Sequence, residues 1–250
     1  MPCNFHVIIP ARFQSSRLPG KLLMDLKGMT IIERVYRQAL LANPKSILIA
    51  TDHAEIFERA KCFGADVLMT SVTHQTGTDR LAEVVKKREF LPDDIIVNVQ
   101  GDEPFIPPAL ISQVAQSLGE SDAPMATLCW PIDNNEYFLN PNVVKVVRDC
   151  HHNALYFSRS PIPANRDKPS SLQHVFRHIG IYAYRAGFLP EIVKLPVCEL
   201  ETIEALEQLR ILWSGFQIRV DKACVPPLQD INTADDLTLA RRLVADIDLP

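Results

Sequence analysis

The chain has 250 residues, of which 47% are hydrophobic and 22% are charged, and its formal net charge at pH 7 is −4. These values are typical of a globular protein that buries a substantial core, as one large domain or a domain with an insertion. The slightly acidic balance disfavours general nucleic-acid binding, which normally requires a basic surface. No apolar run approaches the roughly 20 residues of a membrane span. No signal-peptide pattern is visible either, so we expect a cytoplasmic protein without a membrane partner.

Six cysteines are scattered singly, and no two form a C-x-x-C pair. In an intracellular protein this pattern favours reduced thiols in the core over disulfides or a zinc site. The adjacent His151 and His152 are expected to lie in a turn.

Strand-length apolar segments alternate with helical patterns through the first half of the chain. This alternation indicates βαβ units, and we therefore predict an α/β fold with a mainly parallel sheet. Strands are expected at residues 5–9, 46–50, 66–69, 94–99 and 125–130, and helices between Thr30 and Asn43 and over 54–63, 78–89 and 107–118.

The pattern changes at Pro131. Strand-like runs at 143–148, 154–158 and 176–184 follow one another without long helices, which predicts an antiparallel sheet inserted into the core or packed beside it. Helices are expected again at 188–194 and 200–213, then a strand at 216–221 and a last helix over 233–245. The predicted division is a nucleotide-binding core of residues 1–130 and 186–250, with an inserted region of residues 131–185.

A cationic loop follows the first strand. It carries Arg12, Arg17 and Lys21 and is bracketed by prolines, which disfavour a helix. Open α/β sheets bind anionic ligands at the carboxyl ends of their strands. Guanidinium and ammonium groups suit phosphate oxygens. Three cations alone would indicate a solvated surface loop, but their position directly after the first strand favours a phosphate site.

A second loop, Gln100–Pro104, follows the strand predicted at 94–99. Gly101 allows a sharp turn, so Asp102 is expected at the same carboxyl edge. A magnesium ion bound with a triphosphate needs only one or two protein carboxylates. We therefore expect a magnesium site at Asp102, ahead of the alternative of a turn with two solvated acids.

Several common nucleotide and hydrolase motifs are absent from the sequence. There is no G-x-G-x-x-G after the first strand, no Walker spacing at the Gly-Lys pair, and no G-x-S-x-G elbow. A dinucleotide enzyme, a P-loop protein and an α/β-hydrolase are therefore disfavoured.

The segment Pro10–Lys21 resembles the signature P-A-R-x-x-S-x-R-L-P-G-K of the sugar-activating cytidylyltransferases, more narrowly of those that act on 3-deoxy-manno-octulosonate (Kdo). The motifs HQTGTDR, NVQGDEP, FSR, RHIGIYAYR and LEQLR extend the resemblance over nearly the whole chain. It implies a Rossmann-like three-layer core of the nucleotide-diphospho-sugar transferase type. The implied reaction converts CTP and Kdo into CMP-Kdo and diphosphate for lipopolysaccharide synthesis, in a homodimer built through the inserted region.

The resemblance also implies roles for individual residues. Arg12, Arg17, Lys21 and Asp102 would be catalytic, and the nucleotide would contact Ala11, Arg12, Lys21, Gln75, Thr76 and Arg80. Thr76 replaces the usual serine and keeps its hydroxyl, although on sequence alone this segment is a capped helix start. The sugar would contact Gln100, Arg159, His178, Tyr182, Glu207 and Gln208, each of which, taken singly, is more typical of a structural residue.

The second metal ligand remains open. The family's aspartate in G-[IV]-D-T-P-E-D-L falls on Asn232, and Asp230 lies two positions earlier, on the same face of an extended segment. There are three alternatives: Asn232 coordinates the metal weakly, Asp230 supplies the missing charge, or the second protein contact is lost. We favour coordination shared by Asp230 and Asn232. Thr233 and the acids after it also suit the start of the last helix.

For the reaction we expect in-line attack of the anomeric hydroxyl on the α-phosphorus of CTP, without a covalent enzyme intermediate. Positioning and charge neutralisation by the cations and magnesium would drive catalysis. No residue is identified as a general base, so we expect metal-assisted deprotonation. Two alternatives stay open: a cytidylyltransferase for another acid sugar, such as a nonulosonate, and a catalytically silent nucleotide-binding protein.

Overall fold

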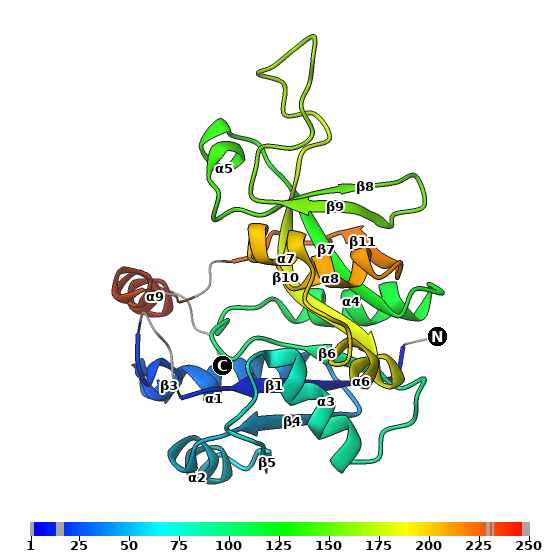
Figure 1. Cartoon of the computed structure of the whole chain (residues 1–250). Helices are drawn as coiled ribbons and strands as arrows, with labels where there is room; N and C mark the ends of the chain where they lie inside the picture. The colour runs from blue at the N-terminus through cyan, green and yellow to red at the C-terminus, as the bar shows by residue number, and fades with distance from the viewer. Residues whose placement is uncertain (1–2, 14–17, 229–230, 232, 247–250) are drawn as a thin grey trace.

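The computed structural model describes residues 3–13, 18–228, 231 and 233–246. Within these residues a sheet of nine strands forms the centre of the fold, with strand order β11-β7-β10-β6-β1-β4-β5 and with β8 and β9 joined beside β10 (Figure 1). The strands are β1 (Phe5–Ala11), β4 (Ser46–Thr51), β5 (Asp66–Met69), β6 (Ile95–Asn98), β7 (Met125–Pro131), β8 (Lys145–Arg148), β9 (Ala154–Ser158), β10 (Phe176–Arg185) and β11 (Ile218–Lys222).

Strand β1 is buried along its whole length. It pairs in parallel with β4 on one side and with β6 on the other. Its side chains alternate between the two faces of the sheet, so that Val7 and Ile9 join one core cluster and Ile8 joins the other. The carboxyl end of this central strand is therefore fixed from both sides.

Helices cover both faces of the sheet. The first core cluster packs α1 (Ile31–Leu41), α2 (Ala54–Cys62) and α4 (Pro108–Gly119) against one face. The second packs α3 (Gly77–Lys87), α6 (Leu189–Ile192) and α8 (Gln208–Trp213) against the other. This three-layer arrangement confirms the predicted α/β fold with a mainly parallel sheet.

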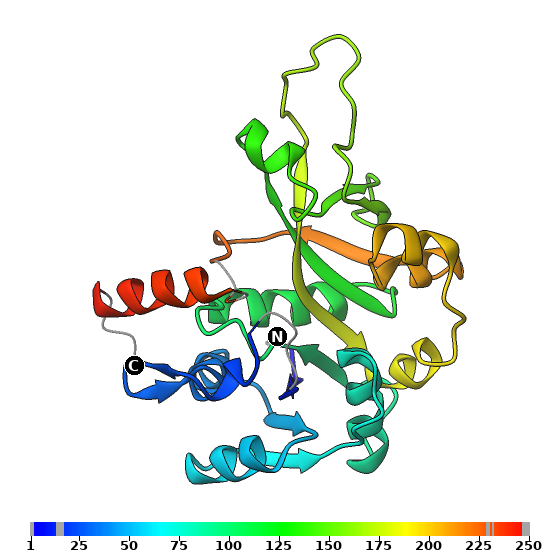
Figure 2. The same ribbon diagram turned by 60° about the vertical axis from the view of Figure 1, so that its left-hand side comes forward.

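Strand β10 connects the core to the upper part of the molecule. Its second half lies antiparallel between β6 and β7, whereas Arg177 near its start pairs with Lys145 of β8. Figure 2 shows it as one long curved strand that runs from the upper region into the sheet. The antiparallel strands of the inserted region thus continue the main sheet, and the division into a core and an insertion stays a prediction.

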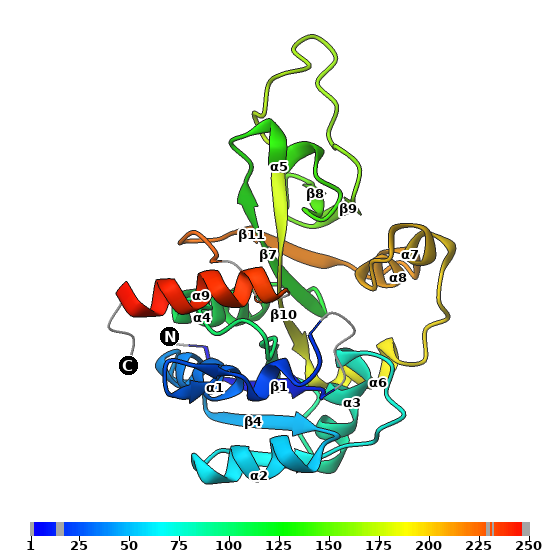
Figure 3. The ribbon, with the colours of Figure 1, turned by 90° about the vertical axis from the view of Figure 1, so that its left-hand side faces the viewer.

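The remaining elements are short or peripheral. They are the hairpin β2 (Asp25–Leu26) and β3 (Met29–Thr30), the 3₁₀ turns η1 (Lys21–Leu23) and η2 (Ala186–Phe188), and the helices α5 (Asn135–Leu139), α7 (Glu199–Glu204) and α9 (Ala234–Asp246). Helix α9 runs along one side of the core (Figure 3), where Arg241 Nη2 donates to the carbonyl of Asp25 at 3.2 Å. No described helix has both the length and the apolar character that a membrane span requires.

The single helix predicted over 200–213 is wrong, because the chain breaks between α7 and α8. Ala205 adopts a left-handed conformation with φ 50°. Arg159 donates to the carbonyls of Glu204 and Ala205, at 2.5 and 3.2 Å, and so occupies acceptors that a continuing helix would use. The helix predicted over 188–194 is likewise shorter, because η2 precedes the four residues of α6.

The expectation of core thiols is correct for only part of the cysteine set. Cys129 and Cys198 are buried, whereas Cys62, Cys150 and Cys224 are exposed. The turn expected at His151 and His152 is confirmed: the backbone N–H of His152 donates to the carbonyl of Asp149 at 3.1 Å.

Candidate active site

Three loops meet at the carboxyl end of β1. A Cβ at Gly101 would lie 3.0 Å from the carbonyl oxygen of Pro10, and one at Gly77 would lie 3.6 Å from the Pro10 ring. The first distance is too short for an ordinary side chain, so glycine at 101 permits the close backbone approach. The loop after β6 and the start of α3 are thereby brought against the end of β1.

The cationic loop presents Lys21 to this meeting point. Gly20 has φ 68°, and its N–H donates to the carbonyl of Phe13 at 3.2 Å, which closes the loop before η1. The Phe13 ring stacks on His53 at 3.7 Å between centroids. Arg12 is exposed. Arg17 lies outside the described residues, so its role remains a prediction.

Lys21 and Asp102 form an ion pair at the sheet edge. Lys21 Nζ lies 2.5 Å from Asp102 Oδ2 and also donates to the carbonyl of Ile231 at 3.1 Å. The N–H of Ile231 donates to the carbonyl of Asp102 at 3.1 Å. The C-terminal segment expected to supply a metal ligand therefore reaches the same place. Its two candidate ligands, Asp230 and Asn232, lie outside the described residues.

Magnesium remains a prediction, but the chemistry of the donors fits it. Asp102 offers a hard carboxylate whose side chain is 26% exposed. In the part of the chain that the structure describes, no three His, Cys, Asp or Glu side chains gather as a metal cluster. A magnesium ion that takes most of its ligands from water and phosphate oxygens needs no such cluster.

The segment predicted to read the base forms the capped start of α3. The Thr76 hydroxyl accepts from the N–H of Asp79 at 3.1 Å, and the Asp79 carboxylate accepts from the N–H groups of Thr76 and Gln75 at 3.0 and 3.1 Å. This capping box fixes the loop, while the Gln75 side chain is exposed. The expectation of a capped helix start is confirmed, and base contact by Gln75 and Thr76 remains a prediction.

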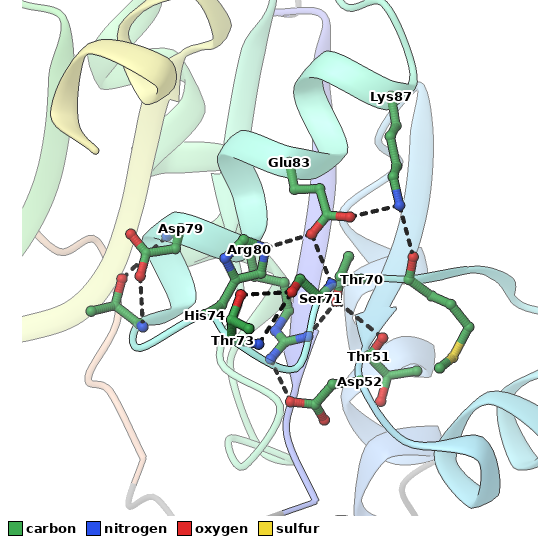
Figure 4. Close-up of polar contacts among 12 residues, drawn as sticks. Thr51, Asp52, Thr70, Ser71, Thr73, His74, Asp79, Arg80, Glu83 and Lys87 are labelled. Atoms are coloured by element: carbon green, nitrogen blue, oxygen red, sulfur yellow. Dashed lines mark hydrogen bonds and ion pairs between the residues drawn. The ribbon is translucent and has the colours of Figure 1, made fainter. Parts of the chain in front are cut away.

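Arg80 lies behind this loop, in a buried ion pair (Figure 4). Its side chain has no exposed surface, and its guanidinium donates to Asp52 at 2.7 Å and to the hydroxyl of Thr70. Asp52 follows β4 and Thr70 follows β5, so Arg80 ties α3 to two neighbouring strand ends. Its predicted contact with a base remains untested, and in this structure the group is held by protein partners.

A second polar network, centred on Glu83, holds the preceding loop (Figure 4). Glu83 contacts His74, accepts from the N–H of Ser71 at 2.8 Å, and pairs with Lys87 at 2.6 Å. Partial burial opposes ionisation, but the hydrogen bonds from Lys87, Ser71 and His74 together lower the pKa of Glu83 to about 2. The sequence analysis missed this network, although the Glu83–Lys87 spacing of one helical turn was visible.

A cavity of about 100 Å³ lies between the start of α3, the end of β6, β10 and α8. It brings together five of the predicted site residues: Thr76, Gln100, Tyr182, Glu207 and Gln208. The structure adds Thr78, Asn98, Tyr184 and Arg210 from the same elements, with an apolar wall formed by Met125, Ile192, Val193 and Ile211. Asn98 and Tyr184 could have been found from the sequence, because each lies two positions from a predicted site residue in an extended segment.

Glu207 links the base-recognition loop to this cavity. The Thr78 hydroxyl donates to its carboxylate at 3.2 Å, and Thr76 also hydrogen-bonds to it. Desolvation raises the pKa of Glu207 against the effect of these hydroxyl groups. Burial likewise raises the pKa of Tyr182 well above its ordinary value.

Arg159 and His178 do not line this cavity. Arg159 is held by the carbonyls at the end of α7 and by Glu204, whose carboxylate accepts from its N–H at 2.8 Å. His178 lies 3.0 Å from the Thr127 hydroxyl and lines a neighbouring cavity of about 300 Å³ with Glu103 and Arg177. Burial of its ring lowers the pKa of His178 to about 3, so the imidazole is neutral at pH 7.

Comparison with known proteins places this arrangement in context. A family model described as cytidylyltransferase matches residues 6–220. A Legionella pneumophila (strain Corby) protein named 3-deoxy-manno-octulosonate cytidylyltransferase is 66% identical over 247 residues, which are 99% of each chain. A Tolumonas auensis protein of the same name is 50% identical over 249 residues, 98% of each chain.

Solved structures agree with these sequence matches. A structure described as CMP:2-keto-3-deoxy-manno-octonic acid synthetase complexed with CTP has a TM-score of 0.90 and 39% identity to this chain. The match covers 97% of this chain and 99% of the other. A 4-diphosphocytidyl-2C-methyl-D-erythritol synthase, with a TM-score of 0.65 and 11% identity, shares the fold alone.

Proposed function

The chain belongs to the cytidylyltransferase family, and within it to the 3-deoxy-manno-octulosonate cytidylyltransferases, and from this premise we propose how it activates Kdo. The reaction transfers CMP from CTP to the sugar and releases diphosphate. The observation that carries the site assignment is the meeting of Lys21 and Asp102, 81 positions apart, at 2.5 Å on the carboxyl edge of the sheet.

The triphosphate binds along the cationic loop, against Arg12, Arg17 and Lys21. Lys21 is held by Asp102 and by the carbonyl of Ile231, so its ammonium group is positioned before the substrate arrives. Cations so placed neutralise the charge that gathers on the departing diphosphate. This preorganisation is a main source of catalysis where the protein makes no covalent bond to substrate.

The chemical step is an in-line displacement. The anomeric hydroxyl oxygen of Kdo forms a bond to the α-phosphorus as the bond from that phosphorus to the bridging oxygen breaks. The hydroxyl proton is released, and diphosphate carries away the electron pair of the broken bond. The protein aligns the two substrates, with CTP at the loops after β1 and β6 and the sugar toward β10 and α8.

Asp102, together with Asp230 and Asn232, is proposed to hold magnesium. When bound, the ion neutralises triphosphate charge. The support is the donor chemistry of Asp102 and the contact of Ile231 with both Lys21 and the Asp102 backbone.

Recognition of the two substrates is proposed as follows. Ala11, Gln75, Thr76 and Arg80 serve the nucleotide, and Gln100, Arg159, His178, Tyr182, Glu207 and Gln208 serve the sugar. The common cavity of Thr76, Gln100, Tyr182, Glu207 and Gln208 supports this assignment. We also propose a cytoplasmic homodimer that supplies lipopolysaccharide synthesis; exposed apolar residues on the upper part of the molecule, such as Leu139 and Leu155, are consistent with an interface there.

The test is a matrix of nucleoside triphosphates and acid sugars with diphosphate release as the readout. CTP with Kdo is expected to give the highest kcat/KM. A preference for a nonulosonate would assign a different acid sugar, and CTP binding without diphosphate release under any pairing would indicate a silent nucleotide-binding protein. Omission of magnesium, with EDTA present, is expected to abolish release; unchanged rates would remove the metal from the proposal.

A further inference from the structure

One polar atom in the site cavity has no partner within the protein. Asn98 ends β6 and is only 4% exposed, and its Oδ1 atom accepts no hydrogen bond. Burial raises the pKa of Tyr184, and a side-chain hydrogen bond with Asn98 opposes that rise, as an amide N–H that donates to the phenol oxygen would; Oδ1 is then the atom left without a partner. Among the described residues, five buried side-chain atoms lack partners, and Asn98 Oδ1 is the one whose residue lines this cavity.

The position of Asn98 places it on the sugar side of the cavity. Asn98 is directly opposite Tyr182 in the antiparallel pairing of β6 with β10. Residues directly opposite in such a pair project from the same face of the sheet. The triphosphate end of the site, at Lys21 and Asp102, lies beyond Gln100 along the same loop. Asn98 therefore lies beside a predicted sugar residue in the lining of the same cavity.

The surroundings of Asn98 select the chemistry of its partner. An amide oxygen accepts hydrogen bonds only, so the missing group is a donor. The carboxylates of Asp79 and Glu207 line the same cavity, and the guanidinium of Arg210 there is bound to Glu201 at 2.7 and 2.5 Å, which together disfavour a phosphate or a substrate carboxylate beside Asn98. Desolvation already raises the pKa of Glu207, so a further anion would be poorly tolerated. A neutral hydroxyl fits, and the apolar lining formed by Met125, Ile192, Val193 and Ile211 suits the C–H surface of a sugar.

Building on the proposed function, we propose that Asn98 Oδ1 accepts a hydrogen bond from a hydroxyl group of the acid sugar. Asn98 is then a residue that determines specificity, because a sugar without a hydroxyl at that place leaves a buried acceptor unpaired. Sites that hydrogen-bond a substrate hydroxyl discriminate strongly against analogues that lack it.

The experiment compares the wild-type enzyme with Asn98→Leu on Kdo and on a set of Kdo analogues, each lacking one hydroxyl. With Kdo, Asn98→Leu should raise KM for the sugar by about 10- to 100-fold and leave KM for CTP within about twofold. One deoxy analogue should raise KM for the sugar by a similar factor in the wild-type enzyme. The same analogue should change KM of Asn98→Leu little relative to Kdo. That loss of discrimination at a single position identifies the hydroxyl.

Two further variants separate contact from structure. Tyr184→Phe removes the hydroxyl that holds the amide but keeps Oδ1, so it should still discriminate against the same analogue. Should Asn98→Leu fail to fold, Asn98→Ala removes the acceptor with less bulk and makes the same comparison.

The proposal is overturned if every analogue raises KM for the sugar by the same factor in the wild type and in Asn98→Leu. It is also overturned if Asn98→Leu raises KM for CTP instead, which would assign Asn98 to recognition of the base. Absence of wild-type turnover with CTP and Kdo would reject the proposed function itself. Normal turnover without selective discrimination would reject only the role of Asn98.

Discussion

Lys21 Nζ lies 2.5 Å from Asp102 Oδ2, and the same ammonium group donates to the carbonyl of Ile231. Three segments that are distant in the chain are thus held by one side chain. Under the proposed function, a bound triphosphate would contact the Lys21 ammonium group and a bound cation would contact the Asp102 carboxylate. The pair therefore holds a cation and a carboxylate at the sheet edge, where we propose that the triphosphate and magnesium bind.

Replacement of Lys21 by Ala is expected to lower kcat/KM for CTP by at least about 100-fold, because it removes the charge that we propose faces the phosphates. Diphosphate release and thermal unfolding should be measured together, and the Tm should change little. Lys45→Ala, a change at an exposed lysine, is the matched control. A near-normal kcat/KM for CTP in Lys21→Ala would remove Lys21 from the site.

The Thr76 hydroxyl both caps α3 and hydrogen-bonds to Glu207, and substitution can separate its role from that of the Thr76 methyl group. Thr76→Val loses the cap on α3 and the hydrogen bond to Glu207. The free energy of unfolding should therefore fall by about 1 kcal/mol, and KM for CTP should rise. Thr76→Ser keeps the hydroxyl and should match the parent in both measurements. A loss in Thr76→Ser with none in Thr76→Val would show that the methyl group, not the hydroxyl, matters.

The ion pair of Arg80 with Asp52 predicts a large effect on stability. Arg80→Met leaves Asp52 without its buried partner and should cost about 3–5 kcal/mol in urea unfolding. Asp52→Asn should destabilise as well, although Asp52 has no predicted contact with CTP. A variant of Arg80 that loses CTP affinity while keeping full stability would instead support direct contact with the base.

Glu83 predicts a pH dependence of stability. Its folded pKa is lowered from 4.5 to about 2, so its stabilising contribution is complete above pH 4.5 and is lost as the pH falls toward 2. Glu83→Gln should therefore lower the free energy of unfolding by about 1–3 kcal/mol at pH 7. The difference from the parent should narrow as the pH falls below 4.5. Glu55→Gln, at an exposed glutamate, serves as the control, and a difference independent of pH would contradict the prediction.

Asn232→Asp restores the family's acidic residue at the second metal position. If Asn232 is a ligand, the magnesium concentration for half-maximal activity should fall, since a carboxylate binds magnesium more strongly than an amide oxygen. Asp230→Asn is the companion variant. An unchanged magnesium titration for Asn232→Asp, with a weakened one for Asp230→Asn, would assign the contact to Asp230.

The sequence by itself determined the fold class and which charged residues lie at the carboxyl edge of the sheet. Alternation of apolar strands with amphipathic helices is a local property, and the strands expected at 66–69 and 154–158 have those bounds in the structure. Open α/β sheets bind ligands at the carboxyl ends of their strands, so the cationic loop with Lys21 and the loop with Asp102 could be predicted at the same edge of the sheet, whereas their direct contact was not predicted.

Only the tertiary structure decided what distant groups do to one another. Arg159 bonds the carbonyls at the end of α7 and breaks a helix that periodicity alone would continue. Arg80 is enclosed by strand ends distant from it in the chain, and Asn98 keeps one side-chain oxygen that has no hydrogen-bond partner among the described residues. Burial and hydrogen-bond satisfaction depend on the whole surrounding shell, and local sequence does not encode that shell.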